Sequence, residues 1–381
     1  MRLEPPVPDD VLAAIAAPFA EVPAHVLDAP VLQPLGLLLD LAGETLRDRL
    51  FIVQAQGGAE ACLRTDFTLP AVQAHIDSGH SSGRYFYSGH AFRVAPRGVE
   101  RAEEFPQLGV EAFEPGDPAL ADAQMAALAW RAAAAGGRDD LTLLMGDIGL
   151  FAAFVGALDL AAPLAARLTR AFSSPRRLRA ELTRIGADAP VAAARGGDRL
   201  AAMLAGLSED AATMVLEDIW SLADIEPVGG RSAAEIVQRL AERAALADAP
   251  RLTEAQADLI TRFLAIADTP STALDAVAKL VGVASPALDA AWQAWARRLD
   301  VLVKAGVPEG RLRFSAAFGR AFGYYDGALF EVRSAALGDD QPVAAGGRYD
   351  GLPARLGGRL ATGAVGCMVR PGRAWAGAPV R

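Results

Sequence analysis

The spacing of apolar residues along the chain changes twice. Up to about residue 160, short apolar runs that predict strands alternate with stretches in which apolar residues recur every three or four positions, as in a helix. Between residues 161 and 309 the helical spacing prevails, and from residue 310 to 381 strand-like runs return. We therefore predict an α+β fold in which residues 1–160 and 310–381 form the two halves of one core and residues 161–309 form a helical insertion.

In the first part, four apolar runs predict strands. They are Leu50–Gln54, Gly89–Ala95, Gly109–Phe113 and Leu141–Met145. The second and third flank a charged loop, so we expect them to pair as antiparallel strands. The alanine-rich stretch 117–135 predicts a helix that ends at Gly136 and Gly137, and a further helix is expected from Gly149 onward.

The insertion should contain several helices. Ser232 and Glu235 have the spacing of a capping box, which begins a helix. Thr253 opens a second helix, and Leu288 and Trp295 lie on the apolar face of a third. This block shows no pattern of alternating apolar residues, so we expect no strand in it.

After the insertion, two stretches predict strands, Arg311–Phe318 and Ala328–Ser334, and Pro342–Leu352 is glycine-rich. The composition agrees with a folded core, because 52% of the 381 residues are hydrophobic and 22% are charged. The formal net charge of −9 argues against a protein whose main task is to bind a phosphate backbone, so we do not expect a nucleic-acid partner.

Cysteine, histidine and the apolar runs exclude several other classes of protein. Two cysteines, Cys62 and Cys367, make neither a disulfide framework nor a metal motif, so we expect reduced thiols and a cytoplasmic location. No targeting segment or membrane span is expected, since Asp147 and Asp159 interrupt the most apolar stretch. His75, His80 and His90 do not have the spacing of metal ligands, and we expect neither a metal nor a cofactor.

Four segments carry residues that could form a binding site. In the first, Leu63–Pro70, the carboxylate of Asp66 and the hydroxyl of Thr68 could hold an ammonium group through charge-assisted hydrogen bonds. The alternative is that Asp66 only caps the helix that follows.

The second segment runs from Phe92 to Glu111. Arg93 and the loop residue Arg101 suit an anion such as a phosphate or carboxylate, because guanidinium offers a planar fork of donors. Gln107 and Glu111 lie four residues apart on the returning strand, so their side chains share a face. The alternative is a hairpin whose charges are solvated or paired with each other.

The third and fourth segments lie beyond the insertion. Arg320–Glu331 combines Arg320 with the adjacent Tyr324 and Tyr325, which could line a pocket or could fill an aromatic core. Ala345–Leu352 contains paired glycines, which permit close approach of a ligand to the backbone or serve only a tight loop.

In this order, the segments resemble the catalytic core of class II aminoacyl-tRNA synthetases, and specifically the histidyl group. The Arg93–Glu111 segment looks like class II motif 2, and the third and fourth segments look like the two histidine-specific motifs. The resemblance covers about residues 10–160 and 310–370. It implies an antiparallel sheet flanked by helices, with the helical block at the position of the histidyl insertion domain.

The resemblance also implies roles for the candidate residues. Asp66 and Thr68 would bind the α-amino group of histidine, and Gln107 and Glu111 would contact the amino acid from the floor of the pocket. Arg93 would face the α-phosphate or carboxylate, Arg101 would lie near the tail of ATP, and Arg320 would correspond to the arginine used in adenylation. Tyr324 and Tyr325 would line the imidazole pocket.

Departures from the synthetase pattern change the expected function. Motif 3 should end in a helix, but Arg370, Pro371 and Gly372 interrupt it, and we expect no helix there. A synthetase would continue with an anticodon domain of roughly 100 residues, and the motif 2 loop carries Glu100, Glu103 and Glu104, which oppose a polyphosphate. We expect the anticodon domain and tRNA charging to be missing.

A chain of this kind resembles the synthetase-like regulatory subunits of short-form ATP phosphoribosyltransferase. That resemblance implies a protein without chemistry of its own, which forms a homodimer within a hetero-oligomer with the short catalytic subunit. It would be required for activity and for feedback regulation by histidine as the effector. The alternatives are a synthetase paralogue that activates histidine or a related amino acid with ATP, and an RNA-binding regulator, which the acidic charge disfavours.

Overall fold

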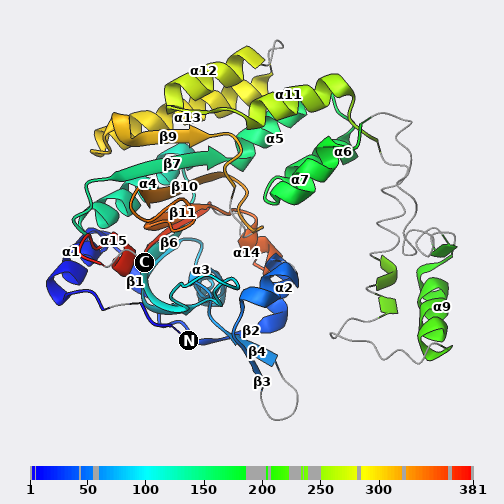
Figure 1. Cartoon of the computed structure of the whole chain (residues 1–381), viewed down its shortest axis with the longest axis horizontal. Coiled ribbons are helices and arrows are strands. Elements are labelled where there is room, and N and C mark those ends of the chain that lie inside the picture. The colour runs from blue at the N-terminus through cyan, green and yellow to red at the C-terminus, as the bar shows by residue number, and fades with distance from the viewer. Residues whose placement is uncertain are drawn as a thin grey trace.

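A nine-stranded mixed sheet forms the centre of the protein (Figure 1). The computed structural model describes residues 2–4, 6–42, 44–54, 60–185, 203–204, 207–222, 233–234, 236–238, 250–280, 285–319, 323–358 and 363–378. The strand order is β1-β5-β6-β12-β11-β10-β7-β9-β8. These strands are β1 His25–Val26, β5 Gly83–Phe92, β6 Glu104–Phe113, β7 Leu141–Asp147, β8 Ala267–Asp268, β9 Leu312–Ser315, β10 Ala328–Ser334, β11 Ala344–Arg348 and β12 Ala364–Val369.

The expected α+β fold, a largely antiparallel sheet flanked by helices, is confirmed. Most neighbouring strands are antiparallel, including the predicted hairpin of β5 and β6, which pairs Gly83 with Phe113 and Phe92 with Glu104. Two pairs are parallel, β1 with β5 and β7 with β9. Strands from both sides of the helical stretch alternate in this sheet, because β12 lies against β6 and β10 lies against β7.

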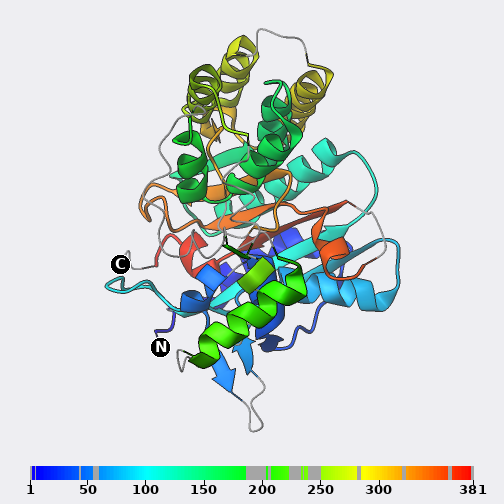
Figure 2. The same ribbon diagram turned by 90° about the vertical axis from the view of Figure 1, so that its right-hand side faces the viewer.

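Helices cover both faces of the sheet (Figures 1 and 2). The helices with described bounds are α1 Asp9–Ala20, α2 Leu35–Ala42, α3 Thr68–Ser78, α4 Pro118–Ala134, α5 Ile148–Gly156, α6 Ala162–Ala171, α7 Pro175–Leu182, α9 Glu209–Leu222, α11 Glu254–Leu264, α12 Pro270–Leu280, α13 Pro286–Lys304, α14 Leu352–Arg355 and α15 Pro371–Ala374. Helix α4 begins where the side chain of Asp117 accepts a hydrogen bond from the Ala119 amide.

Alternation along β6 separates the two faces of the sheet. Leu108, Val110 and Ala112 point into the main core, which they share with α1 and α4. The side chains at the alternate positions, which include Gln107 and Glu111, point to the opposite face, where α3 contacts the strand. The candidate site residues of this strand therefore lie on the face away from α4.

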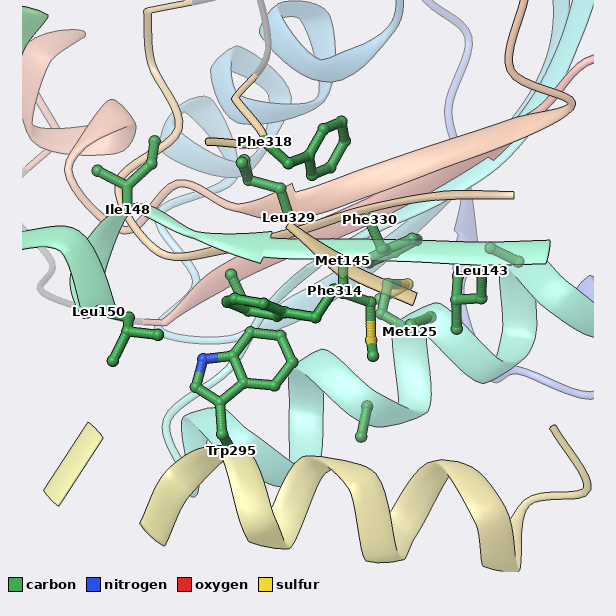
Figure 3. Packing of buried hydrophobic residues seen from close by; sticks show 14 of the residues in the cluster. Met125, Leu143, Met145, Ile148, Leu150, Trp295, Phe314, Phe318, Leu329 and Phe330 are labelled. Carbon is green, nitrogen blue, oxygen red and sulfur yellow. The ribbon is translucent and has the colours of Figure 1, made fainter. Parts of the chain in front are cut away.

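Helix α13 belongs to the main core. Its residue Trp295 is 1% exposed and packs edge-on against Phe314, with ring centroids 5.0 Å apart (Figure 3). The indole nitrogen of Trp295 donates to the carboxylate of Asp147 at 2.8 Å. The last helix of the 161–309 stretch thus packs directly on the central sheet, and the division of the chain into three parts stays a prediction.

A second, smaller sheet covers the site side of the molecule. It consists of β2 Leu32–Pro34, β4 Glu60–Leu63 and β3 Ile52–Gln54, in that order, and the short 3₁₀ helix η1 Glu44–Arg49 precedes β3. A separate apolar cluster joins this sheet, α2 and α3 to Tyr324 and Tyr349. The cluster holds the tyrosines of the third and fourth segments in place.

Two expectations were wrong. The two-residue strand β8 lies within the stretch expected to be all helix, and it is too short to give any alternating pattern. The glycine-rich segment, for which no element was predicted, forms strand β11 between β10 and β12. A one-turn helix, α15, begins at Pro371, since proline is tolerated in the first turn, where its missing N–H has no helical partner.

Other expected features gave mixed outcomes. The helix from Thr253 is confirmed as α11, and Thr253 forms a capping box with Gln256. The capping box of Ser232 and Glu235 lies outside the described residues. None of the described helices has both the length and the apolar character that crossing a membrane requires.

A buried ion network joins α4, α13 and β11. The Asp122 carboxylate, which is 4% exposed, accepts from Arg348 Nε at 2.7 Å and from Arg298 Nε at 3.0 Å. Arg298 also reaches Asp147 at 3.3 Å, and Arg348 reaches Asp350 at 2.8 Å. The buried guanidinium groups of Arg298 and Arg348 therefore share hydrogen bonds to one buried carboxylate, that of Asp122.

We predict that Asp122→Ala lowers the free energy of unfolding by about 3–5 kcal/mol, because it leaves two buried guanidinium groups without their shared partner. Asp300→Ala is the matched control, since it breaks an exposed pair with Lys304 and should cost about 0.3–0.5 kcal/mol. Urea unfolding followed by circular dichroism measures both. Equal losses in the two variants would contradict the role given to Asp122.

Candidate functional site

A small polar cavity lies on the face of the sheet opposite α4. Six of the nine candidate residues line it, together with Tyr87 and backbone from β11 and β12. The six are Asp66, Thr68, Arg93, Glu111, Tyr324 and Tyr325. These residues come from segments that are up to 259 positions apart in the sequence, between residues 66 and 325. The cavity volume is about 20 Å³, enough for a water molecule.

Glu111 lies at the centre of this cavity and is 2% exposed. Three hydroxyl groups donate to its carboxylate: Thr68 Oγ1 at 2.9 Å, Tyr87 Oη at 3.3 Å, and Tyr349 Oη. Burial raises the pKa of Glu111 to about 7, against the lowering effect of these hydrogen bonds. A carboxyl group that titrates near neutral pH can meet an imidazole in either protonation state.

Glycine residues make the room that Glu111 and Tyr87 occupy. A side chain at position 366 on β12 would overlap the Glu111 carboxylate, and one at position 109 on β6 would overlap the Tyr87 hydroxyl. Gly366 pairs with Glu111 across the two strands, so the Glu111 carboxylate occupies the space that a side chain at position 366 would fill. The sheet accepts a buried acid here because the neighbouring strand carries no side chain at that point.

Asp66 both supports the start of α3 and lines the cavity. Its Oδ1 accepts from the Thr68 amide at 3.2 Å, and its Oδ2 lies 4.0 Å from Arg93 Nη2. The N-cap of α3 is Phe67, which makes no side-chain cap bond, so Asp66 is not the capping residue, although it accepts from the first amide of the helix. The side chain is 12% exposed and faces the cavity, so one carboxylate oxygen serves the backbone while the other faces an arginine.

Arg93 lines the small cavity on the side of the Thr65 backbone and the Phe105 ring. Its Nε donates to the Thr65 carbonyl oxygen at 3.0 Å, and its guanidinium lies 5.6 Å from the centre of the Phe105 ring. These contacts orient the planar group toward the cavity that it lines. Arg93 lines a second, larger cavity as well.

Tyr324 and Tyr325 form the aromatic wall of the cavity, and Tyr349 packs against both. The rings of Tyr324 and Tyr325 lie 4.7 Å apart, and Tyr349 meets both edge-on at 5.9 and 6.2 Å. Burial raises the pKa of Tyr324 well above its usual range, so the phenol stays neutral. Tyr325 packs against Gly347 of β11, which leaves space for the ring.

The structure does not bring every candidate residue into this cavity. Gln107 is 0% exposed, lies on the same face of β6 as Glu111, and places its Nε2 3.7 Å from the sulfur of Met368, but it does not line the cavity. Among the described residues, no hydrogen-bond donor meets Gln107 Oε1. Arg320 lies outside the described residues.

The larger cavity, of about 450 Å³, shares Arg93 and Met368 with the small one. We call it the arginine cavity, because it is lined by Arg49, Arg93, Arg101, Arg370 and Arg373. Arg101, the predicted anion-binding residue of the loop, forms an ion pair with Asp340 at its rim. Burial lowers the pKa of Arg370 to about 10, and the neighbouring Arg93 adds to the effect.

Several site residues were missed from the sequence. Tyr87 and Tyr349 reach Glu111 but received no role, and Arg370 and Arg373 were regarded only as part of an interrupted motif. The pairing of β5 with β6 places Tyr87 opposite Gly109, two residues before Glu111. That register, together with the alternation of side chains, is the pattern that could have revealed Tyr87.

The chain is similar to known proteins over most of its length. The family model described as histidyl-tRNA synthetase matches residues 25–218 and 211–371. A Mesorhizobium japonicum protein named ATP phosphoribosyltransferase regulatory subunit is 36% identical over 362 residues, which cover 94% of this chain and 95% of that protein. One of the same name from Agrobacterium fabrum is 35% identical over 91% of each chain.

The chain belongs to the family of ATP phosphoribosyltransferase regulatory subunits. Solved structures agree on the fold. A Bacillus halodurans protein described as an ATP phosphoribosyltransferase regulatory subunit/histidyl-tRNA synthetase aligns with a TM-score of 0.64 at 18% identity, over 100% of this chain and 82% of that one. A histidyl-tRNA synthetase from Nostoc aligns with a TM-score of 0.58 at 16% identity, over 96% and 69%.

We predict that the buried carboxyl group of Glu111 makes the stability of this regulatory subunit depend on pH. Its pKa is about 7 in the folded chain against 4.5 as the usual value, so the folded state binds the proton more tightly. The contribution is therefore fully present below pH 4.5 and is lost as pH rises through 7.

As pH rises from 4.5 to 7, wild type loses this contribution and Glu111→Gln does not. The difference in unfolding free energy should therefore change in favour of Glu111→Gln by up to about 3 kcal/mol. Denaturant unfolding at a series of pH values measures the difference. Glu114→Gln, which alters a half-exposed carboxylate paired with Arg84, should show no such trend. Parallel stability curves for wild type and Glu111→Gln would contradict the prediction.

Proposed function

We propose that this chain is a non-catalytic regulatory subunit of ATP phosphoribosyltransferase in histidine biosynthesis. It is required for the activity of a short catalytic subunit, and it carries the feedback effect of histidine. The observation that supports this function best is one buried cavity that combines two carboxylates, Asp66 and Glu111, with a guanidinium group, Arg93. Few small metabolites match that set of charges.

Free histidine matches it at three points. Its ammonium group suits Asp66 with the Thr68 hydroxyl, and its carboxylate suits Arg93, which offers a planar fork of donors. Its imidazole can hydrogen-bond Glu111, whose pKa of about 7 lies close to that of imidazole. Tyr324 and Tyr325 would flank the ring.

Gln107 supplies a buried oxygen that can accept a hydrogen bond. The small cavity must enlarge before histidine enters, because about 20 Å³ holds no more than a water molecule. Histidine therefore favours an arrangement in which the surrounding side chains have moved. A ligand that binds two arrangements unequally shifts their balance by its difference in affinity, commonly about 1–3 kcal/mol. This linkage gives an amino-acid site control over an associated subunit.

The partners proposed from the family follow the same logic. The chain would form a homodimer within a hetero-oligomer in the cytoplasm, with the short catalytic subunit as its partner. The catalytic subunit would carry all the chemistry, so that this chain needs no tRNA charging and no cofactor.

We predict that Asp66→Asn weakens histidine binding by about tenfold to a hundredfold, because the neutral amide loses a charge-assisted hydrogen bond worth about 1.5–3 kcal/mol. The amide keeps an oxygen for the Thr68 N–H, so the start of α3 should survive. Isothermal titration calorimetry with histidine measures the loss.

Asp77→Asn is the control, because Asp77 lies exposed in the last turn of α3, where it accepts a hydrogen bond from the side chain of Gln73. Both variants should unfold at the wild-type temperature. Unchanged affinity in Asp66→Asn, or no binding of histidine to the wild type, would count against the histidine site.

We predict that a short ATP phosphoribosyltransferase catalytic subunit from the same organism is active only when mixed with this chain. Co-purification and an assay of phosphoribosyl transfer with each chain alone and with both together measure this. Histidine should inhibit the mixture, and Asp66→Asn should raise the histidine concentration needed. A catalytic subunit that is equally active alone would refute the proposal.

A second candidate function is activation of histidine by ATP. The observation that favours it is the arginine cavity beside the amino-acid site, where Arg93 and Arg373 lie on the wall. Pyrophosphate exchange that depends on histidine tests this candidate. A clear exchange signal would replace the regulatory role with a catalytic one.

A further inference from the structure

The N-terminal segment, residues 2–4, lies along the motif 2-like loop. The Arg2 carbonyl oxygen accepts from the Glu103 amide at 2.8 Å, and the Glu4 amide donates to the Glu104 carbonyl oxygen at 3.1 Å. Leu3 forms a parallel bridge with Glu104. These backbone bonds direct the side chain of Glu4 toward α15, which lies beside α1 and β6 (Figure 1).

There the Glu4 carboxylate pairs with Arg370. The distance from Glu4 Oε1 to Arg370 Nη2 is 2.5 Å, and the two side chains are 8% and 6% exposed. The guanidinium stacks on Phe105, 3.6 Å from the centre of the ring. Among the described residues, neither Glu4 Oε2 nor Arg370 Nε has a hydrogen-bond partner, so this buried pair is only partly satisfied.

The pair neutralises one wall of the arginine cavity. Other carboxylates act in the same way: Asp66 lies 4.0 Å from Arg93 and Asp340 pairs with Arg101. Asp340 is 67% exposed, so water screens its charge. Glu4 is buried, and its negative charge therefore acts on Arg370 with little screening. Glu331, a buried carboxylate that lines the cavity, pairs instead with Arg333, which does not line it.

We propose that Glu4 is an internal counter-anion that keeps phosphate-bearing ligands out of the arginine cavity. A polyphosphate that approached Arg370 would meet a fixed negative charge in a buried setting. It would bind there only by displacing Glu4 from its partner. This role goes beyond the proposed function. It would explain how the chain can hold a free amino acid in the small cavity without binding a nucleotide in the arginine cavity beside it, which five arginines line.

Two substitutions remove Glu4 from Arg370 in independent ways. Glu4→Gln removes the charge and keeps the shape. Gly372→Ala keeps the charge but places a methyl group 2.7 Å from Glu4 Cδ, which must move away. The control is Glu100→Gln, which removes an 84% exposed carboxylate from the same loop, where it pairs with Arg2.

The experiment titrates the intact wild-type chain and the variants with inorganic pyrophosphate at low ionic strength. Both Glu4→Gln and Gly372→Ala should bind at least about tenfold more tightly than wild type, a change of about 1.4 kcal/mol. Glu100→Gln should bind as the wild type does. Wild-type binding equal to that of both folded variants would overturn the proposal.

Folding of the variants is part of the test. If one variant fails to fold, the other decides. If neither folds alone, recovery of the folded state with pyrophosphate supports the proposal, because the anion then replaces the missing carboxylate, and no recovery overturns it. Histidine binding is scored separately with Asp66→Asn, so that failure of one proposal leaves the other intact.

Discussion

Asp122 accepts hydrogen bonds from Arg298 of α13 and Arg348 of β11, and so ties a helix of the long helical stretch to the strand that runs beneath the site. A buried carboxylate between two guanidinium groups permits few other arrangements, because any shift leaves a charge unpaired in a medium that solvates it poorly. Arg348 continues to Asp350, which also accepts from the Ala364 amide at the start of β12. The position of β12, and with it the room for Glu111, depends on this network.

The site repeats the same principle with polar groups of its own. Glu111 is surrounded by hydroxyls from α3, β5 and the end of β11, so that three elements meet at one carboxylate. The arginines of the neighbouring cavity are matched by carboxylates from distant segments, such as Glu4 and Asp340. Carboxylates of the chain itself therefore balance part of the positive charge around the arginine cavity.

Much of the fold was legible in the sequence, and part of the site. Strand β10 has the predicted bounds, and α4, from Pro118 to Ala134, lies within one residue of the predicted helix at each end. Six candidate residues meet in one cavity, but their selection came from resemblance to a family, since each segment also had a structural alternative. Tyr87 and Glu4 were missed because their importance depends on strand register and on contacts across 366 positions, which no local pattern encodes.

Strand β12 and Arg370, the residue that follows it, run from the small cavity to the arginine cavity. Gly366, Met368 and Arg370 follow one another at every second position, and they lie at the Glu111 carboxylate, at the wall common to both cavities, and at the arginine cavity. At about 3.3 Å per residue the ends of this row are roughly 13 Å apart. A one-residue insertion or deletion in this strand would turn Met368 and Arg370 to the opposite face of the sheet, and the two cavities would then lose their common wall.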